Sequence, residues 1–197
     1  MPRLDVPMPQ PSFPAKAALA ALLLAAPIAG CGGIPVIANT YYDVSYGPGE
    51  WGGGNDMPVV VRGAPFAVPK AELDEAVAAA MRGSTFGVPT RFVPAAPGAA
   101  PAYRVVMIFN PPAGVGDAVA CQRPVPPDAV FGAAPAGVVP VLAAFCRGDR
   151  AVTSAAGTIP TGGNPHSAAF QDGVAQFAMA LFPPINPNNK AGMEFNP

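Results

Sequence analysis

The sequence has few of the side chains on which most enzymes depend. It contains one histidine, His166, in 197 residues, and only 12% of its residues are charged. A zinc site needs three or four ligands, and one histidine with a few widely spaced cysteines does not supply them. A Ser-His-Asp triad needs a base that reaches a nucleophile held at a distance along the chain, whereas Ser167 is adjacent to His166 and badly placed. We therefore expect no metal and no catalytic residue, and a hydrolase is the least favoured function.

An excess of charge of either sign is also missing. The 11 basic and 12 acidic residues give a formal net charge of −1, and no basic patch points to nucleic acid. Glycine patterns that bind phosphates or dinucleotides are absent as well, because the triple glycine at residues 52–54 lacks both the spacing and a following helix. The sequence predicts no cofactor and no nucleic-acid partner.

No hydrophobic run is long enough to cross a membrane. The apolar stretch at residues 17–30 has fourteen residues and is interrupted by Pro27, whereas a spanning helix needs about 20. Lys16 precedes the stretch, and small residues end it. A charged start, an apolar middle and small residues before a cut site predict a secretory signal peptide over residues 1–30, beginning at Met1 or Met8.

The end of this stretch reads Ile28-Ala29-Gly30-Cys31, which resembles the lipobox of bacterial lipoproteins. The resemblance implies that the Cys31 thiol carries diacylglycerol, that the chain is cut before Cys31, and that the new amino terminus is acylated. Several fatty chains on one residue hold a protein firmly to a membrane. The residue after the cysteine is Gly32 rather than the aspartate that retains lipoproteins in the inner membrane. The expected location is therefore the cell envelope, anchored in the outer membrane and facing the periplasm. An ordinary signal peptide with a chance cysteine is the alternative.

Two cysteines remain once Cys31 is acylated, namely Cys121 and Cys146. An even number of cysteines in an exported chain should pair, because that compartment oxidises thiols. We therefore expect a disulfide between Cys121 and Cys146 that holds a long loop at the end of a strand. The alternative is two buried free thiols.

The chain after the signal peptide divides into three parts. Residues 31–56 are glycine-rich and are expected to form a lipidated, flexible tether, although the tyrosines at 41, 42 and 46 leave open a short edge strand over residues 34–46. Residues 57–184 are expected to form a single domain. Residues 185–197 are expected to be a disordered tail.

Apolar periodicity predicts the elements of this domain. Strands are expected at residues 57–62, 90–93, 103–109, 138–146 and 151–159, helices at 70–82 and 165–182, and a long loop at 111–137. Asn164 is the expected cap of the second helix, with Pro165 in its first turn. Each helix has one apolar stripe to bury on a sheet. The fold class is therefore α+β, a two-layer sandwich whose sheet, mostly antiparallel, has roughly four or five strands with two helices on one face.

The order of these elements looks like that of small periplasmic lipoprotein domains that assist envelope assembly. Such a likeness in fold does not determine function. The favoured hypothesis is a membrane-anchored envelope lipoprotein with a non-enzymatic binding or structural role. Its expected partners are the membrane, through the anchor at Cys31, and another envelope protein, with the oligomeric state left open. A periplasmic module that binds a small ligand is the alternative.

Overall fold

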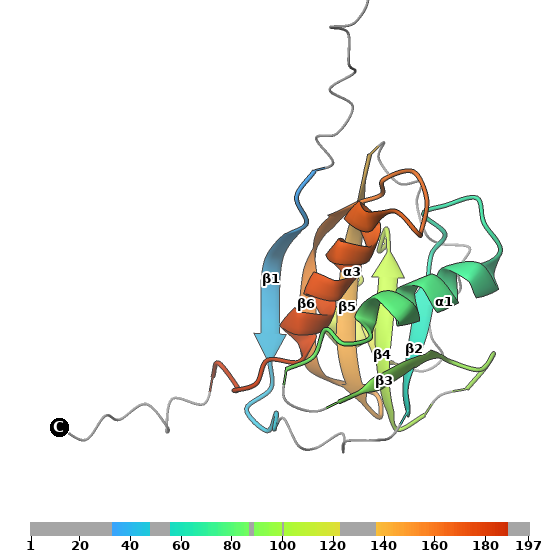
Figure 1. Cartoon of the computed structure of the whole chain (residues 1–197). Coiled ribbons are helices and arrows are strands. Elements are labelled where there is room, and N and C mark those ends of the chain that lie inside the picture. Colours follow the sequence, from blue (N-terminus) through green and yellow to red (C-terminus); the bar gives the residue numbers. More distant parts are fainter. Residues whose placement is uncertain (1–32, 48–55, 87–88, 100, 123–136, 189–197) are drawn as a thin grey trace, which may run out of the picture. The chain divides into compact units, whose positions relative to one another are not determined.

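The computed structural model in Figure 1 describes residues 33–47, 56–86, 89–99, 101–122 and 137–188. In chain order its elements are β1 (Val36–Tyr42), β2 (Asp56–Arg62), α1 (Lys70–Met81), β3 (Arg91–Pro94), β4 (Tyr103–Phe109), α2 (Asp117–Ala120), β5 (Val138–Arg147), β6 (Arg150–Pro160) and α3 (Ala168–Leu181). The fold is α+β, as expected. The predicted signal peptide lies outside the described residues.

The sheet is larger and more mixed than the sequence predicts. Its six strands are arranged in the order β1-β6-β5-β4-β2-β3. The β1–β6, β6–β5 and β5–β4 pairs are antiparallel, whereas β4–β2 and β2–β3 are parallel. The expectation of a mostly antiparallel sheet of four or five strands is therefore only roughly matched, because the sheet has a sixth strand and two of its pairs are parallel. Parallel neighbours need a crossover connection, and α1 provides the one between β2 and β3.

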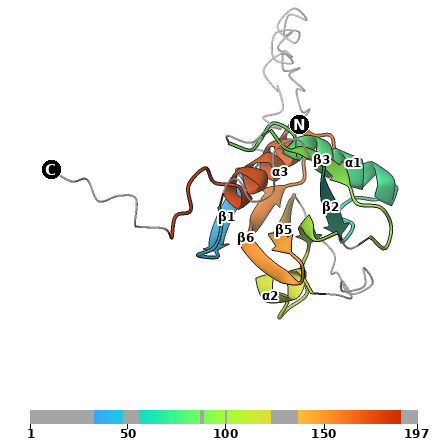
Figure 2. The same cartoon turned by 90° about the horizontal axis from the view of Figure 1, so that it is seen from below.

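The helices α1 and α3 cover one face of the sheet, and the short α2 lies on the other (Figure 2). Every residue of the apolar stripe predicted for α3 is buried: Phe170, Val174, Phe177, Ala178 and Leu181. A Cβ atom on Gly173 would lie only 2.8 Å from the Cβ of Ile159, so the absent side chain lets α3 approach β6 closely. This helix–sheet layer forms the main core.

The central strand β4 is buried on both faces, as its sequence predicts. Val105, Met107 and Phe109 belong to the core under the helices, whereas Val106 and Ile108 belong to the cluster on the α2 side. A strand covered on both sides reads as a continuous apolar run rather than an alternating one. Its pattern therefore identifies the middle of the sheet.

The start of α3 differs from the prediction. Its N-cap is Ser167, whose Oγ accepts a hydrogen bond from the backbone N–H of Phe170 at 3.3 Å. The expected cap, Asn164, instead accepts from the backbone N–H of His166 at 2.9 Å. Both types of residue cap helices well, and here the asparagine forms the preceding turn. His166 therefore lies before the helix and not in its first turn.

The two ends of the described chain are more ordered than expected. β1 pairs with β6 along its length, which resolves the alternative left open for residues 34–46 in favour of a strand. The tail expected to be disordered from Ile185 is docked as far as Asn188, whose side chain donates to the Tyr42 carbonyl at 2.7 Å. Residues 189–197 lie outside the described part.

Candidate functional site

The proposed lipidation residue, Cys31, lies outside the described residues. The glycine-rich residues 48–55, which follow β1, also lie outside them. The described chain begins at Gly33, two residues beyond the cysteine, and β1 begins at Val36. In the described ranges, no helix is both long enough and apolar enough to span a membrane. The chain between Cys31 and the sheet is therefore much shorter than the predicted tether of residues 31–56.

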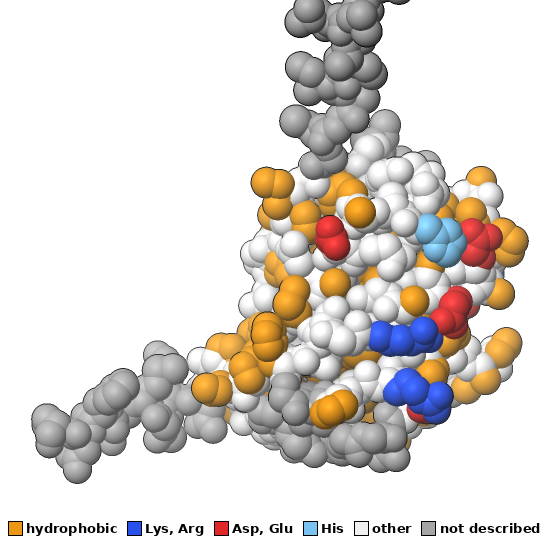
Figure 3. Space-filling view, viewed as in Figure 1, with side chains coloured by type: hydrophobic (Ala, Val, Ile, Leu, Met, Phe, Trp, Pro, Cys, Tyr) orange, Lys and Arg blue, Asp and Glu red, His pale blue; other side chains and the backbone are white. Residues whose placement is uncertain are grey.

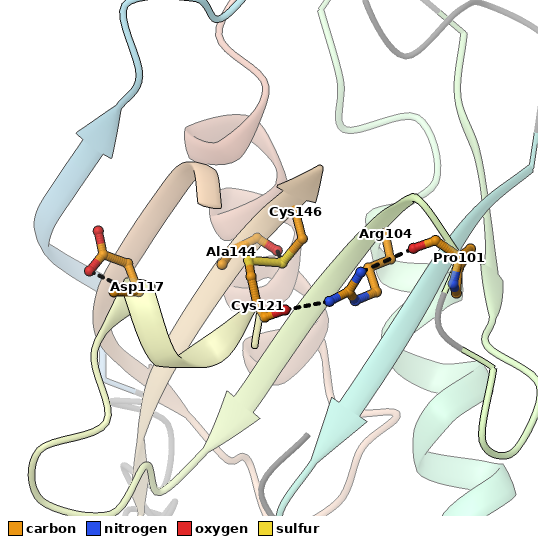
Figure 4. The surroundings of a disulfide bond; sticks show 7 residues. Pro101, Arg104, Asp117, Cys121, Ala144 and Cys146 are labelled. Atoms are coloured by element: carbon orange, nitrogen blue, oxygen red, sulfur yellow. Dashed lines mark hydrogen bonds between the residues drawn. A yellow bond between two sulfur atoms is a disulfide. The ribbon is translucent and has the colours of Figure 1, made fainter. Parts of the chain in front are cut away.

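The predicted disulfide is present and lies on the face of the sheet opposite α1 and α3. It joins Cys121, directly after α2, to Cys146 near the end of β5, with Cα atoms 5.6 Å apart. Both cysteines are completely buried. Figure 4 shows the bond between the end of α2 and β5. The cross-link therefore anchors a four-residue helix that has little core of its own.

Arg104 supports the same segment from β4. Its side chain is completely buried and donates to the Cys121 carbonyl at 2.6 Å and to the Pro101 carbonyl at 3.0 Å (Figure 4). Arg104 is a buried donor because β4 is central in the sheet and residue 104 faces the α2 side.

A groove of about 430 Å³ lies on this α2 side of the sheet. One wall is formed by the α2 segment, from Pro111 to Asp117, and its floor by β1, β6 and β5. Most of the lining is apolar, including Val115 and Leu142, and the polar groups come from residues such as Asn39 and Ser154. Clefts of several hundred Å³ with a few polar groups are typical of small-molecule sites.

A cluster of polar residues lies directly after the end of β1. Asp43 is only 4% exposed, and its Oδ1 accepts from the Ser45 backbone N–H at 2.8 Å and from the Ser45 hydroxyl at 2.7 Å. Its Oδ2 is paired with Arg150 from the β5–β6 turn. The hydrogen bonds from Ser45, aided by the charge of Arg150, lower the pKa of Asp43 from 3.8 to about 2. The carboxylate stays ionised over the physiological range.

The tail completes this cluster. Asn186 is 5% exposed, and its Nδ2 donates to the Asp43 carbonyl at 2.8 Å and to the Tyr46 carbonyl at 3.3 Å. The Tyr46 hydroxyl donates to the Pro183 carbonyl at 2.8 Å, and burial raises the pKa of this tyrosine. We call Asp43, Ser45, Tyr46, Arg150 and Asn186 the Asp43 clasp. It ties the turn after β1, the β5–β6 turn and the tail to one another.

The comparisons with known proteins give little guidance. No family model matches the chain, and no curated protein matches it. Two of the solved structures that match are crystals of the PelC dodecamer from Paraburkholderia phytofirmans, one of them a point variant. They are 14% and 15% identical, cover 74% of this chain and 92% and 93% of that one, and have a TM-score of 0.37. A likeness this weak carries no argument about this chain.

His166 and Ser167, the histidine and serine weighed in the sequence analysis, both make contacts near the start of α3. His166 is 61% exposed at its side chain and lies 3.2 Å from a Glu72 carboxylate oxygen. The Ser167 hydroxyl donates to the Thr161 carbonyl at 2.9 Å while it caps α3. No group of three metal-ligating side chains occurs in the part of the chain that the structure describes. Apart from these contacts, the described residues present two surface features, the groove beside α2 and the outer edge of β1.

Proposed function

We propose that this chain is a lipid-anchored protein of the bacterial cell envelope with a non-enzymatic binding role, held in the outer membrane through Cys31 and facing the periplasm. The lipobox-like sequence before Cys31 supports the anchor. The disulfide between Cys121 and Cys146 supports an oxidising compartment such as the periplasm. The bound partner is an extended segment of another envelope protein, which pairs with the outer edge of β1.

The observation that carries this proposal is the composition of the edge strand β1. Its seven residues, Val-Ile-Ala-Asn-Thr-Tyr-Tyr, include no charged residue and no proline. Natural proteins protect sheet edges with charges, proline or very short strands, because an open edge pairs readily with another strand. The opposite edge strand, β3, is protected in this way, since it has four residues, starts with Arg91 and ends with Pro94.

The side chains along β1 also suit a docked partner. Val36 is 54% exposed and Tyr41 is 42% exposed. Hydrophobic side chains follow the side of the molecule where β1 lies (Figure 3). A strand added to an edge gains affinity from main-chain hydrogen bonds and specificity from alternate side chains. The register of β1 is interrupted once, between Ile37 and Asn39, which leaves the segment from Asn39 to Tyr42 as its longest regular stretch. The Tyr42 carbonyl at the end of this stretch is already bonded to Asn188, so the edge offered to a partner is centred on Thr40.

Site-specific photo-crosslinking in cells tests the proposal. A photoreactive residue at Thr40 should capture one defined envelope protein, and the same residue at the exposed Ala79 of α1 should not. A lysine at Asn39 should abolish the capture from Thr40, because a charge at an edge opposes strand addition, whereas a lysine at Ala71 should leave it unchanged. Equal capture from Thr40 and Ala79, or capture that survives the lysine at Asn39, would show that the β1 edge is not the binding surface.

A second candidate function is the binding of a small apolar ligand, and the groove beside α2 favours it. The test is to titrate the mature protein with fatty acids and other small apolar probes and to follow the amide resonances of Val115 and Leu142, which line the groove. Saturable shifts there that disappear when Ser154 is replaced by a bulky Phe would support a ligand-binding module. Shifts spread over the whole surface would contradict it.

A further inference from the structure

In three neighbouring strands and the turns next to them, the charged residues lie at one end. The strands β1, β6 and β5 are neighbours, and residues 33–42, 137–146 and 151–165 contain no charged side chain. Asp43 follows the end of β1, and the remaining charges, Arg147, Asp149 and Arg150, lie at the β5–β6 turn. The register brings these positions together, since Tyr42 is paired with Thr153 and Arg147 with Arg150.

The other end of the same strands is uncharged. There Val36 is paired with Thr158, and Val138 with Pro160. A Cβ atom on Gly33 would lie 3.8 Å from Val138 and 3.9 Å from Pro160, so the start of the described chain packs at this end. We call residues 33–36, 137–138 and 160–163 the uncharged end.

Two loops next to the uncharged end also lack charged residues. The loops that follow β2 and β4, residues 63–69 and 110–116, contain no charged residue. Beyond them, Lys70 is paired with Asp74, and Glu72 lies 3.2 Å from His166. Asp117 begins α2, beside the groove. Among the described residues, Arg62 directly precedes the first of these loops and is partly buried.

The uncharged end is also the end closest in sequence to the anchor. Ile34 is three residues after Cys31, and three residues can span at most about 11 Å. If Cys31 carries the lipids, as the proposed function holds, Ile34 stays within that distance of the lipid attachment point. The length of chain therefore restricts which side of the domain can meet the membrane.

Side chains at this end suit a bilayer surface. Ile34 is 83% exposed, Val36 is 54% exposed and Val138 is 36% exposed. Exposed apolar residues also occur near the Asp43 clasp, where Val44 is 82% exposed and Ile185 is 65% exposed. Exposure alone therefore does not select an end. The charges and the short connection to Cys31 do, because charged groups avoid the acyl region into which apolar side chains insert.

We propose that the uncharged end rests on the bilayer that holds the lipids of Cys31, with Ile34, Val36 and Val138 inserted at the boundary between headgroups and acyl chains. The β5–β6 turn and the Asp43 clasp then point away from the membrane. The partner is a phospholipid surface, and this inference rests on the proposed lipidation. In this orientation the outer edge of β1 extends from the membrane toward the periplasm.

Quenching of tryptophan fluorescence by brominated phospholipids tests the orientation. The chain has one natural tryptophan, Trp51, which is replaced by Phe in the lipidated protein. A new tryptophan is then placed at Val36 or, as the matched control at the other end of β1, at Val44. In phosphatidylethanolamine–phosphatidylglycerol vesicles, we expect roughly threefold or more quenching at position 36 relative to position 44, because interfacial burial reaches only a few ångströms. Equal quenching, or more at position 44, would overturn the proposal.

A second pair of variants tests the apolar contact itself. With the reporter tryptophan at Val138, the double variant Ile34→Asp/Val36→Asp should lose most of the quenching, whereas Val44→Asp/Ile185→Asp should retain it. Thermal melts of both variants check that the domain is folded. If a folded Ile34→Asp/Val36→Asp variant is quenched as strongly as its parent, the apolar side chains do not hold this end on the membrane.

The experiment separates this inference from the proposed function. An intact mass without acyl groups on Cys31 would contradict the proposed lipidation. The mature chain can then be coupled through Cys31 to a maleimide phospholipid, because the other two cysteines are joined in the disulfide. If the coupled protein still shows quenching at position 36 and not at position 44, the uncharged end is a membrane-facing surface. If it does not, the inference fails whatever the natural anchor is.

Discussion

Asp43 is the residue at which three separated parts of the chain meet. It binds Ser45 in its own turn and Arg150 from the β5–β6 turn, 107 residues away, and its carbonyl accepts from Asn186, 143 residues away. A buried carboxylate must have such partners, because a buried charge left unpaired is strongly destabilising. Its side chain is therefore more important to stability than its place near an exposed turn indicates.

Replacement of Asp43 should destabilise the domain and remove part of its acid sensitivity. We expect Asp43→Ala to lower the free energy of unfolding by about 2 kcal/mol, because Ser45 and Arg150 lose their acceptor. The folded-state pKa of Asp43, about 2, lies below the ordinary 3.8. The carboxylate therefore contributes stability that is fully present above pH 4 and is lost as the pH falls toward 2. Urea denaturation between pH 7 and pH 2 should show a flatter pH dependence for Asp43→Asn than for the wild type.

Asp149 provides the matched control, since it lies in the neighbouring turn and is exposed. Asp149→Ala should change the free energy of unfolding by less than about 0.5 kcal/mol, as most surface substitutions do. A loss above about 2 kcal/mol would mean that Asp149, and not Asp43 alone, holds the turn. Wild-type stability of Asp43→Ala would show that the clasp contributes nothing to the fold.

The sequence could not reveal the clasp, and the reason is physical. Asp43, Arg150 and Asn186 lie in turns, at the start of a strand or in the tail, and only the folded sheet brings them together. By contrast, the core positions of β4 and α3 could be predicted, because apolar periodicity reports burial directly. The cap of α3 could be predicted only in part. Asn164 and Ser167 are both good caps, and the choice depends on the turn that Pro165 forms.

At the scale of elements, β1 is the strand that the sequence predicts least clearly. It is mostly exposed, so it has no strict alternation of apolar and polar residues, and glycine-rich segments surround it. Its place depends on β6, where Gly157 has no side chain. A Cβ atom on Gly157 would lie 1.9 Å from the Val36 carbonyl oxygen. The close approach of the two backbones is therefore possible only with glycine at this position.

Gly157→Ala should detach the start of β1 from the sheet. We expect a loss of about 1–3 kcal/mol in the free energy of unfolding, because the methyl group would force the backbones apart. Hydrogen exchange of the β1 amides should become faster. Gly33→Ala is the matched control at the same end, since its Cβ would make ordinary contacts of 3.8 and 3.9 Å. If the β1 amides exchange at equal rates in the two variants, the close contact at Gly157 does not position the strand.

The disulfide holds α2 on the sheet, as the close approach at Gly157 holds β1. Cysteine count and compartment predicted the pairing, because two cysteines in an oxidising compartment have few alternatives. What the sequence did not indicate was Arg104, whose buried side chain supports the Cys121 carbonyl. The cross-link and the arginine therefore act on the same short segment from β5 and β4.

Removal of the disulfide should destabilise the domain substantially. The bond closes a loop with a sequence separation of 25, and the loss of that constraint on the unfolded chain corresponds to roughly 3.5 kcal/mol. A reductant should lower the melting temperature of the wild type and should not affect Cys121→Ala/Cys146→Ala. Non-reducing peptide mapping of periplasm-derived protein should recover the two linked peptides. Free thiols at both positions after export would contradict the prediction.

At the scale of the whole molecule, the proposed anchor and the domain are close together along the chain. The glycine-rich composition of residues 31–56 predicts a flexible tether before a separate domain. Instead the sheet begins at Val36, five residues after Cys31. The glycine-rich residues 48–55 therefore connect two strands of the sheet, β1 and β2, rather than the anchor and the domain. An anchor attached directly to an edge strand restricts the orientations that the domain can adopt at a membrane.

Cys31 is the residue expected to carry the lipid anchor. The protein extracted from membranes should have the intact mass of a chain that begins at Cys31 and carries several acyl groups. One fatty chain gives only marginal, reversible attachment, with a partition constant of about 10⁴ M⁻¹, whereas several chains hold a protein firmly. High salt or carbonate should therefore leave the wild type in the membrane fraction, and Cys31→Ser should appear without acyl groups and leave that fraction. Cys121 and Cys146 are joined to each other, so no other cysteine can take the lipid in its place. A mature protein that starts at another residue, or that is freely soluble in the periplasm, would contradict the anchor and with it the membrane-facing orientation of the native protein.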